Sequence, residues 1–596
     1  MTAAPMYQTP PSSPIAPGDA LVAHAEALCA AGQLTEAEAV LRDAITITPD
    51  NLAAYRALSL LLVGSGRDVE AFAACGTMLA HAGHADAETL RLAAEILLFL
   101  HIRHESLITR RAEPARLDLR PIGIADATPL VLAPEYLSRA RALAVAAVEQ
   151  APDDAAAYGA LAECALRAGF TMEARLAAER AVACDATIGT LVARVLANFA
   201  DHREQAALTE LRQPQLTELV PSFATGQHLI VRVDPTGASD ARLDDPARQP
   251  WRLAYLVQHA GTEHARSVTV HTGPSSVRAI ARGRVVGELF FAIDGSDSGY
   301  VHGVVDEPDV AFGMPRCHDV ATLIARGRNS VLWSTRDRRL LLHSPAGEKV
   351  RGGRAFLLAS NGSHSYYHWI ADALGRLAAM PEVLLDPDMR FVVPAPLQPF
   401  QVETLAWLGI TLERVVQVAP DEILEFDELL VVSHRKEGGC SDAATWRWLS
   451  DHLTIPDMSE SPAPTRRLFL PGASAVRHLN NQAEVEALCA ARGFESVDTS
   501  TLSVAARRDL FSDVAIVVSP LGTGLTDLLF APAGARTILF GQQSYVVPCY
   551  NALASALGHS VRYVLGAEEP SRYVYPHWDY RVDLDDVRAA LDAELA

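Results

Sequence analysis

The sequence predicts two α/β halves with mostly parallel sheets, preceded by an all-α helical repeat domain and a β-rich segment. Three observations support this fold class. Alanine and leucine recur at helical spacing over residues 17–204, short alternating runs fill 205–350, and apolar strands alternate with helices over 351–596. A chain of 596 residues is too long for one hydrophobic core, so about three to four domains are expected.

The first domain is predicted to be a stack of helix pairs. Ala37, Leu41, Ala44 and Pro49 stand where a tetratricopeptide repeat of about 34 residues has its small, large, small and helix-ending residues. Residues of the same kinds recur at Tyr55, Leu58, Leu62, Ala71, Ala140, Ala144, Ala147, Pro152, Tyr158, Leu161, Ala165, Ala174 and Ala181. The period breaks around 104–133. Such an array most often binds a protein or peptide, and the alternative is a rigid appendage.

Composition disfavours several classes of function. The formal net charge of −21 is spread along the chain, which argues against nucleic acid as a partner because backbone phosphates require a basic surface. The eight cysteines include no Cys-x-x-Cys pair, so neither a metal cluster nor a disulfide framework is expected, and a reducing cytosol fits best.

Targeting signals are not predicted. Residues 1–16 lack the basic and apolar regions of a signal peptide and are expected to be a disordered leader. The longest apolar runs, such as 58–63 and 96–100, are far shorter than a bilayer span. We therefore expect no transmembrane segment and a cytoplasmic protein, either free or held at the inner membrane by partners.

Changes in composition mark the later boundaries. Residues 205–350 are predicted to be a β-rich segment leading into the catalytic region, because alternating runs at 267–272, 284–293 and 330–335 are separated by turn residues. Two α/β halves are then predicted over 351–457 and 458–596, with the Pro/Ser-rich stretch 456–465 as a hinge.

The first candidate motif lies at residues 360–377. His368, Asp372 and Arg376 are spaced i, i+4 and i+8 on a helix predicted to begin near Ser365, so they project from one face. An imidazole held by a carboxylate suits general-base catalysis, and a guanidinium one turn further along suits an anionic substrate group. The alternative is a capped helix with an Asp372–Arg376 salt bridge and a satisfied histidine.

The second candidate motif lies at residues 514–530, where a buried strand, a glycine turn and a helix follow one another. Gly522 and Gly524 allow close backbone approach, and Thr523 and Thr526 add hydroxyl groups. Such a turn presents backbone N–H groups and the positive end of a helix to an anion. This is the predicted site for a nucleotide diphosphate held without a metal, although many α/β proteins turn in the same way.

The two motifs, His-Trp-x-x-Asp-x-x-x-Arg at 368–376 and Gly-Leu-Thr-Asp-Leu-Leu-Phe at 524–530, together resemble those of the family 61 glycosyltransferases. The resemblance covers about residues 290–580. It implies the GT-B arrangement of two Rossmann-like halves and an inverting transfer from a nucleotide-sugar donor to a glycan or protein acceptor. No metal or other cofactor is implied.

The resemblance also implies roles for individual residues. His368 or Asp372 would be the base, and we prefer His368 with Asp372 as its orienter. The residues implied to hold the donor diphosphate are Arg376, Arg477, Asn480, Gly522, Thr523, Gly524 and Thr526. The repeat domain would dock the acceptor or a protein partner.

Four residues depart from the family pattern. Pro471-Gly472 replaces a Ser-Arg pair, Leu521 replaces a frequent histidine, and Asp527 replaces the usual asparagine. Because a lost basic group weakens a diphosphate site, two alternatives stay open. One is a degenerate transferase domain acting as a nucleotide- or glycan-binding module or as a repeat scaffold. The other is an enzyme of another α/β class that uses the same glycine turn.

Overall fold

The computed structural model describes residues 17–65, 67–81, 86–111, 134–233, 241–242, 250–271, 276–293, 300–302, 327–335, 337, 339–360, 362–432, 436–437, 440–454, 463–472, 477–543, 547–569 and 578–596. They fall into two compact units, which we describe separately. The predicted leader lies outside the described residues, as does much of the predicted repeat break at 104–133 and of the hinge at 456–465. No helix in the described part of the chain has both the length and the apolar character needed to cross a membrane.

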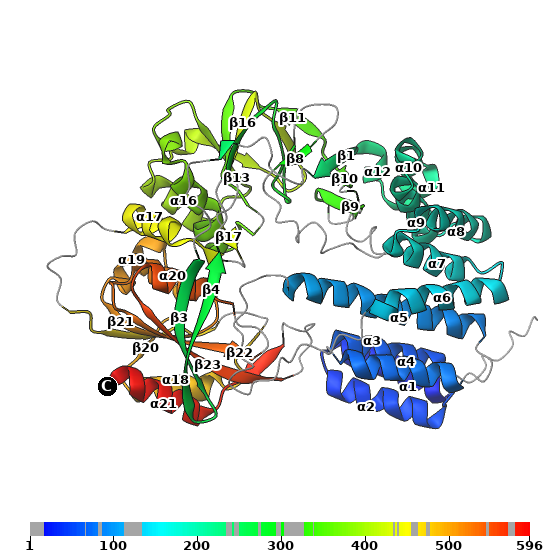
Figure 1. The fold of residues 1–596 in the computed structure, drawn as a ribbon, viewed down its shortest axis with the longest axis horizontal. Coiled ribbons are helices and arrows are strands. Elements are labelled where there is room, and N and C mark those ends of the chain that lie inside the picture. Colours follow the sequence, from blue (N-terminus) through cyan, green and yellow to red (C-terminus); the bar gives the residue numbers. More distant parts are fainter. Residues whose placement is uncertain are drawn as a thin grey trace, which may run out of the picture. The chain divides into compact units, whose positions relative to one another are not determined.

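The first unit consists of helix pairs, as the repeat pattern predicts (Figure 1). Its helices are α1 (Pro17–Ala30), α2 (Leu34–Ile47), α3 (Leu52–Gly64), α4 (Asp68–His81), α5 (Ala87–Arg111), which belongs to this unit up to His101, and α6 (Pro134–Gln150). The repeat residues of these helices are buried, among them Leu41, Leu58 and Ala144. Asn51 begins α3 by accepting a hydrogen bond from the N–H of Ala54 at 3.0 Å, and its amide donates to Asp19 of α1 at 3.0 Å.

The second unit begins with more helices of the same kind, which are α7 (Ala155–Ala168), α8 (Thr171–Cys184), α9 (Ile188–Ala200), α10 (Glu204–Leu211), α11 (Pro214–Leu219) and α12 (Ser222–Thr225). Pro214 stands in the first turn of α11, where its fixed φ suits the start of a helix and its missing N–H costs no hydrogen bond. The buried guanidinium of Arg339 joins these helices to the following sheet. It donates to the carbonyl of Phe199 at 3.2 Å and to Glu204 at 2.7 Å.

That sheet has the strand order β11-β15-β6-β7-β8-β1-β10-β9. Its strands are β1 (Gln227–Val233), β6 (Arg284–Val286), β7 (Phe291–Ile293), β8 (Tyr300–His302), β9 (Ser330–Ser334), β10 (Arg339–Ser344), β11 (Glu348–Val350) and β15 (Ile423–Glu425). Most neighbours are antiparallel, as the alternating patterns of the β-rich segment predict.

The second sheet contains the first predicted half. Its order is β14-β13-β12-β16-β5-β2, with β14 (Val415–Val418), β13 (Arg390–Pro394), β12 (Arg354–Leu357) and β16 (Glu428–Val432) parallel, and β5 (Ser276–Ala281) and β2 (Ala241–Arg242) antiparallel. Helical residues 366–379 and α16 (Pro399–Trp407) pack on one face. In the part of the chain that the structure describes, the other face packs on strands of the first sheet, which differs from the helices on both faces of a Rossmann-like fold.

The third sheet contains the second half, in the order β20-β19-β21-β22-β23-β3-β4. The strands β20 (Glu495–Ser496), β19 (Arg466–Phe469), β21 (Val514–Pro520), β22 (Arg536–Gln542), β23 (Ser560–Glu569) and β3 (Pro250–His259) are parallel, and β4 (Thr262–His271) and β24 (Asp579–Arg581) are antiparallel. Helices α18 (Gln482–Ala490) and α21 (Leu584–Leu595) cover one face, and α19 (Val504–Phe511) and α20 (Cys549–Ala556) cover the other (Figure 1). The hairpin β3–β4 comes from the β-rich segment, which thus contributes strands to each of the three large sheets.

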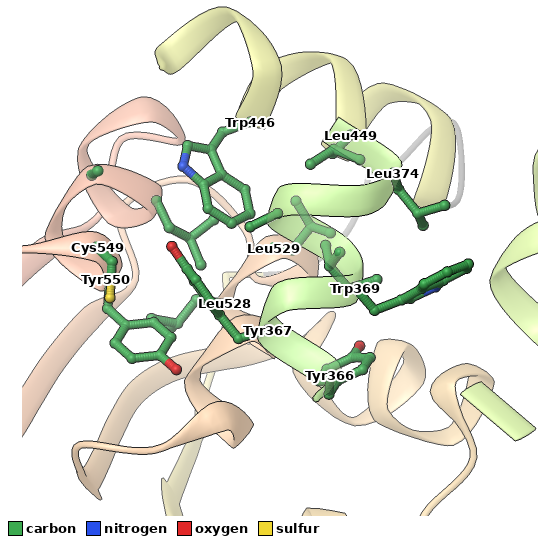
Figure 2. Close-up of a cluster of buried hydrophobic side chains, with 14 of the residues drawn as sticks. Tyr366, Tyr367, Trp369, Leu374, Trp446, Leu449, Leu528, Leu529, Cys549 and Tyr550 are labelled. Atoms are coloured by element: carbon green, nitrogen blue, oxygen red, sulfur yellow. The ribbon is translucent and has the colours of Figure 1, made fainter. Parts of the chain in front are cut away.

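One hydrophobic core joins the two α/β halves. Phe356 and Trp369 from the first half belong to the same buried cluster as Leu468 and Tyr563 from the second. Figure 2 shows the helical turns with Tyr367 and Leu374 between Trp446 of α17 (Ala443–Leu453) and the residues Leu528, Leu529 and Tyr550 of the second half. The segment with the first candidate motif is therefore held by packing from both halves.

A buried histidine pair between α12 and the first sheet makes the fold sensitive to acid. The rings of His228 and His343 lie 4.9 Å apart, and burial lowers the pKa of His228 to about 3 and that of His343 to about 4. Because these pKa values lie below the ordinary value of 6.5, the pair favours folding above pH 6.5, and this contribution is lost as the pH falls toward 4 and 3.

We expect His228→Phe to weaken this acid sensitivity. Neither ring nitrogen of His228 has a hydrogen-bond partner among the described residues, so phenylalanine should raise the free energy of unfolding at neutral pH by about 1 kcal/mol. Thermal unfolding of wild type and variant over the acid range measures the change. His364→Phe, at an exposed loop position, is the control, and equal acid slopes in wild type and His228→Phe would contradict the interpretation.

Candidate functional site

The first candidate motif follows strand β12 at the carboxyl edge of the second sheet, at the point where the strand order reverses. The chain moves from β12 to β13 and β14 on one side and later returns to β16 on the other, and ligands of α/β proteins bind at such points. Gly362, with a left-handed φ of +88°, folds the loop over the site, since a Cβ there would lie 3.2 Å from the ring of His368. The backbone after β12 is therefore shaped around this histidine.

His368 and Asp372 form the pair that their spacing predicts. Nδ1 of His368 lies 2.6 Å from Oδ2 of Asp372. Because a carboxylate accepts this hydrogen bond, Nδ1 carries the proton and Nε2 is the basic nitrogen. The side chain of His368 is 41% exposed and that of Asp372 only 5%. The imidazole is therefore accessible to solvent, whereas the carboxylate that orients it is buried.

Arg376 does not share the exposed face of His368. The helix starts with α15 (Tyr366–His368), widens to a π-helical turn over Trp369–Ala373 and tightens to a 3-10 turn over Leu374–Ala379, so its residues do not follow one regular period. Nη1 of Arg376 donates to the carbonyls of Leu357 at 3.0 Å, Leu358 at 3.3 Å and Ala359, where β12 ends. The guanidinium is 2% exposed, and burial lowers its pKa to about 10. It supports the loop after β12 and is not placed to meet a diphosphate.

The glycine turn occupies the corresponding place in the third sheet. The chain goes from β19 to β20 on one side and then to β21 on the other, so the carboxyl ends of β19 and β21 form the switch point. Gly472 lies against the turn, because a Cβ there would stand 3.3 Å from Pro520. A Cβ at Gly524 would lie 3.0 Å from the hydroxyl of Thr499. Both glycines thus permit a close approach of backbone at the carboxyl edge.

The two threonines of the turn differ in exposure. A 3-10 helix over Thr523–Phe530 follows Gly522, in place of the predicted α-helix. Thr523 is exposed and can meet a ligand directly. Thr526 is fully buried, and its hydroxyl has no hydrogen-bond partner among the described residues. The turn retains the N–H groups and partial positive charge expected at the start of a helix.

The structure brings the two motifs together through Tyr366 and Asp527. The Tyr366 hydroxyl donates to Oδ1 of Asp527 at 2.8 Å across the two halves. Arg507 of α19 adds a positive charge, with its guanidinium 4.7 Å from the centre of the Tyr366 ring. Glu403 of α16 forms another link between the halves, because its carboxylate accepts hydrogen bonds from the first N–H groups of α19 at 2.7 and 2.8 Å.

Arg477 and Asn480 lie in the loop after β19 beside β24. Arg477 is half-buried and lowers the pKa of Tyr580, although burial raises that pKa more. The hydroxyl of Tyr580 donates to the carbonyl of Phe540, which also accepts the N–H of Leu521 next to the glycine turn, so Arg477 belongs to the same edge of the sheet. The amide of Asn480 donates to Glu569, which favours a role in holding β23 over diphosphate binding.

Sequence reasoning missed the positions that connect the motifs. Tyr366 and Asp527 are distant in sequence, and no local pattern indicates that they meet. The one available signal is an acidic residue inside an apolar run, Leu-Thr-Asp-Leu-Leu-Phe, where an unpaired charge is costly. Within the described ranges, no group of three or more His, Cys, Asp or Glu side chains is arranged to hold a metal ion.

Several solved structures of tetratricopeptide-repeat (TPR) proteins are similar to about a third of the chain. TTC0263, a thermophilic TPR protein of Thermus thermophilus, is 17% identical, with coverage of 34% of this chain and 92% of its own and a TM-score of 0.25. YrrB, a TPR protein with an unusual peptide-binding site, is 15% identical, with coverage of 34% and 85% and a TM-score of 0.22. MamA is 12% identical, with coverage of 34% and 90% and a TM-score of 0.23.

Part of the α/β region matches a family model. No curated protein matches the chain. The model of the Glycosyltransferase 61 family matches residues 366–538, a segment that contains His368, Asp372, Arg477 and the glycine turn. The chain therefore carries a family 61 glycosyltransferase domain over these residues.

Proposed function

We propose that the protein transfers a sugar from a nucleotide-sugar donor to a hydroxyl group of a glycan or protein acceptor, with inversion at the anomeric carbon. The observation that carries the proposal is the His368–Asp372 pair, on a helix that is hydrogen bonded to the residue after the glycine turn. Nε2 of His368 takes the proton of the acceptor hydroxyl as its oxygen attacks the anomeric carbon. The bond to the diphosphate breaks, and its electron pair leaves with the nucleoside diphosphate.

The charge of the leaving diphosphate is stabilised at the edge of the third sheet. We assign this role to the N–H groups of residues 522–524, the Thr523 hydroxyl and the Arg477 guanidinium, because the N–H of Leu525 already donates to the carbonyl of Gly522. Neither Arg376 nor Asn480 belongs to this set, because protein groups already occupy both side chains.

The helical repeats dock the acceptor or an assembly partner, and the enzyme works in the cytoplasm.

We expect a nucleoside diphosphate or sugar nucleotide to raise the melting temperature of the purified protein. A ligand at about 100 times its Kd stabilises a fold by about 2.7 kcal/mol. Arg477→Ala should raise the Kd about tenfold or more, since it removes a charge-assisted contact. Arg588→Ala is the matched control, because Arg588 lies on α21 and forms an ion pair with Asp585 of the same helix. If no nucleotide stabilises the protein, the catalytic proposal is wrong and a scaffold role for the repeats takes its place.

A further inference from the structure

Asp527 is a buried carboxyl group at the point where the two motifs meet. Its side chain is fully buried, and Oδ1 accepts the hydroxyl of Tyr366 at 2.8 Å. Oδ2 has no hydrogen-bond partner among the described residues. Asp527 directly follows Thr526 of the glycine turn, and Tyr366 is two residues before His368. One carboxyl group thus touches both parts of the proposed site.

The charges around Asp527 do not compensate for its burial. Arg507 is the cation that acts on it, but its Nε donates to the carbonyl of Leu502 at 3.1 Å, and no ion pair forms between Arg507 and Asp527 in the described structure. The other titratable groups on the elements packed against this helix are Tyr367, His368, Arg447, Asp451, His452, Arg508, Asp509, Cys549 and Tyr550. Burial therefore dominates and raises the pKa of Asp527 to about 7.

An ionised Asp527 would oppose a diphosphate at the adjacent turn. A buried carboxylate with an unsatisfied oxygen is already unfavourable, and a second negative group nearby adds like-charge repulsion in a medium that screens it poorly. A neutral carboxylic acid avoids both costs and still accepts the hydrogen bond from Tyr366. The asparagine that Asp527 replaces in the family pattern would be neutral in the same way.

We propose that Asp527 is a positioning residue that must be protonated for a nucleotide diphosphate to bind the glycine turn, and that its bond to Tyr366 then couples the occupied turn to the helix of His368. This inference rests on the proposed function, because it assumes that the turn binds a diphosphate. It makes donor binding dependent on pH near neutrality. By linkage, diphosphate binding also takes up a proton wherever free Asp527 is ionised.

The test is calorimetric titration of the full chain with uridine diphosphate and with guanosine diphosphate. Between about pH 5.5 and about pH 8.5 the protonated fraction of a group with a pKa near 7 falls about thirtyfold, so the apparent Kd of the wild type should rise up to about thirtyfold. For Asp527→Asn, the apparent Kd should show only the small pH dependence that titration of the nucleotide itself causes. Asp509→Asn, at a side chain that is 67% exposed, removes the same charge and should keep the wild-type slope.

Proton uptake gives a second readout that a purely structural role would not change. Titrations near pH 8 in two buffers of different ionisation enthalpy should show close to one more proton taken up by the wild type than by Asp527→Asn. Equal pH slopes, or equal proton uptake, in these two proteins would overturn the coupling.

Thermal unfolding without nucleotide separates this proposal from the proposed function. A raised pKa in the fold stabilises the protein below the ordinary value of 3.8, and that contribution is lost as the pH rises toward 7. The melting temperature of the wild type should therefore fall relative to Asp527→Asn over this range, and coincident profiles would show that Asp527 is not held neutral. If the profiles differ but neither diphosphate binds either protein, both the proposed function and the coupling are wrong. The conclusion that the fold keeps Asp527 neutral would still hold.

Discussion

Replacing His368 by glutamine is expected to lower the rate of sugar transfer by about two to four orders of magnitude, while nucleotide binding changes little. Glutamine can keep a hydrogen bond to Asp372 but has no nitrogen that takes a proton, so only the general-base contribution is removed. The proposed diphosphate site is on the other half, so nucleotide binding should survive the substitution. Initial rates and calorimetric Kd values with the donor identified in the nucleotide screen measure the two effects separately.

His364→Gln is the matched control for this experiment. His364 is exposed and lies four residues before His368, in the loop that precedes α15, so His364→Gln should retain the wild-type rate. Asp372→Asn should reduce the rate less than His368→Gln, because it disturbs the orientation of the imidazole but leaves the base present. If instead Asp372→Asn abolished transfer while His368→Gln remained active, Asp372 would be the base and our assignment would be reversed.

Sequence periodicity located the local elements of the α/β region well. The helices α16, α18 and α19 lie where apolar spacing and flanking turn residues favour a helix, and both are local signals. The addition of β3 to β23 was not predictable in this way. That pairing joins Val257 to Tyr563 across about three hundred residues, and no sequence pattern in either strand specifies which strand will be its neighbour.

The candidate site was predictable to the extent that it depends on near neighbours in sequence. The contact of His368 with Asp372 follows from i, i+4 spacing, which the turn at this point preserves. The same reasoning extended to Arg376 does not account for its burial, since it assumed one regular helix through a segment that changes from α to π to 3-10 geometry. Contacts across the halves, such as Tyr366 with Asp527, depend on tertiary packing and require the structure.

The burial of Arg376 leads to the second large effect, which is on stability. Arg376→Met should lower the free energy of unfolding by about 3–5 kcal/mol, because methionine fills part of the volume but leaves the carbonyls of Leu357, Leu358 and Ala359 without their donor. Such a loss is a large share of the stability of a typical domain. Urea unfolding followed by the fluorescence of the buried Trp369 and Trp446 reports on this core directly.

The same variant distinguishes a structural Arg376 from a diphosphate ligand. Arg390→Met removes an exposed arginine from the neighbouring strand β13 and should leave the urea midpoint near that of the wild type. If Arg376 held the diphosphate, Arg376→Met would keep the wild-type midpoint and weaken nucleotide binding instead. The contact of Arg376 with three carbonyls at the end of β12 predicts the opposite result. The urea midpoint of Arg376→Met should fall, and the molecules that remain folded should bind nucleotide as the wild type does.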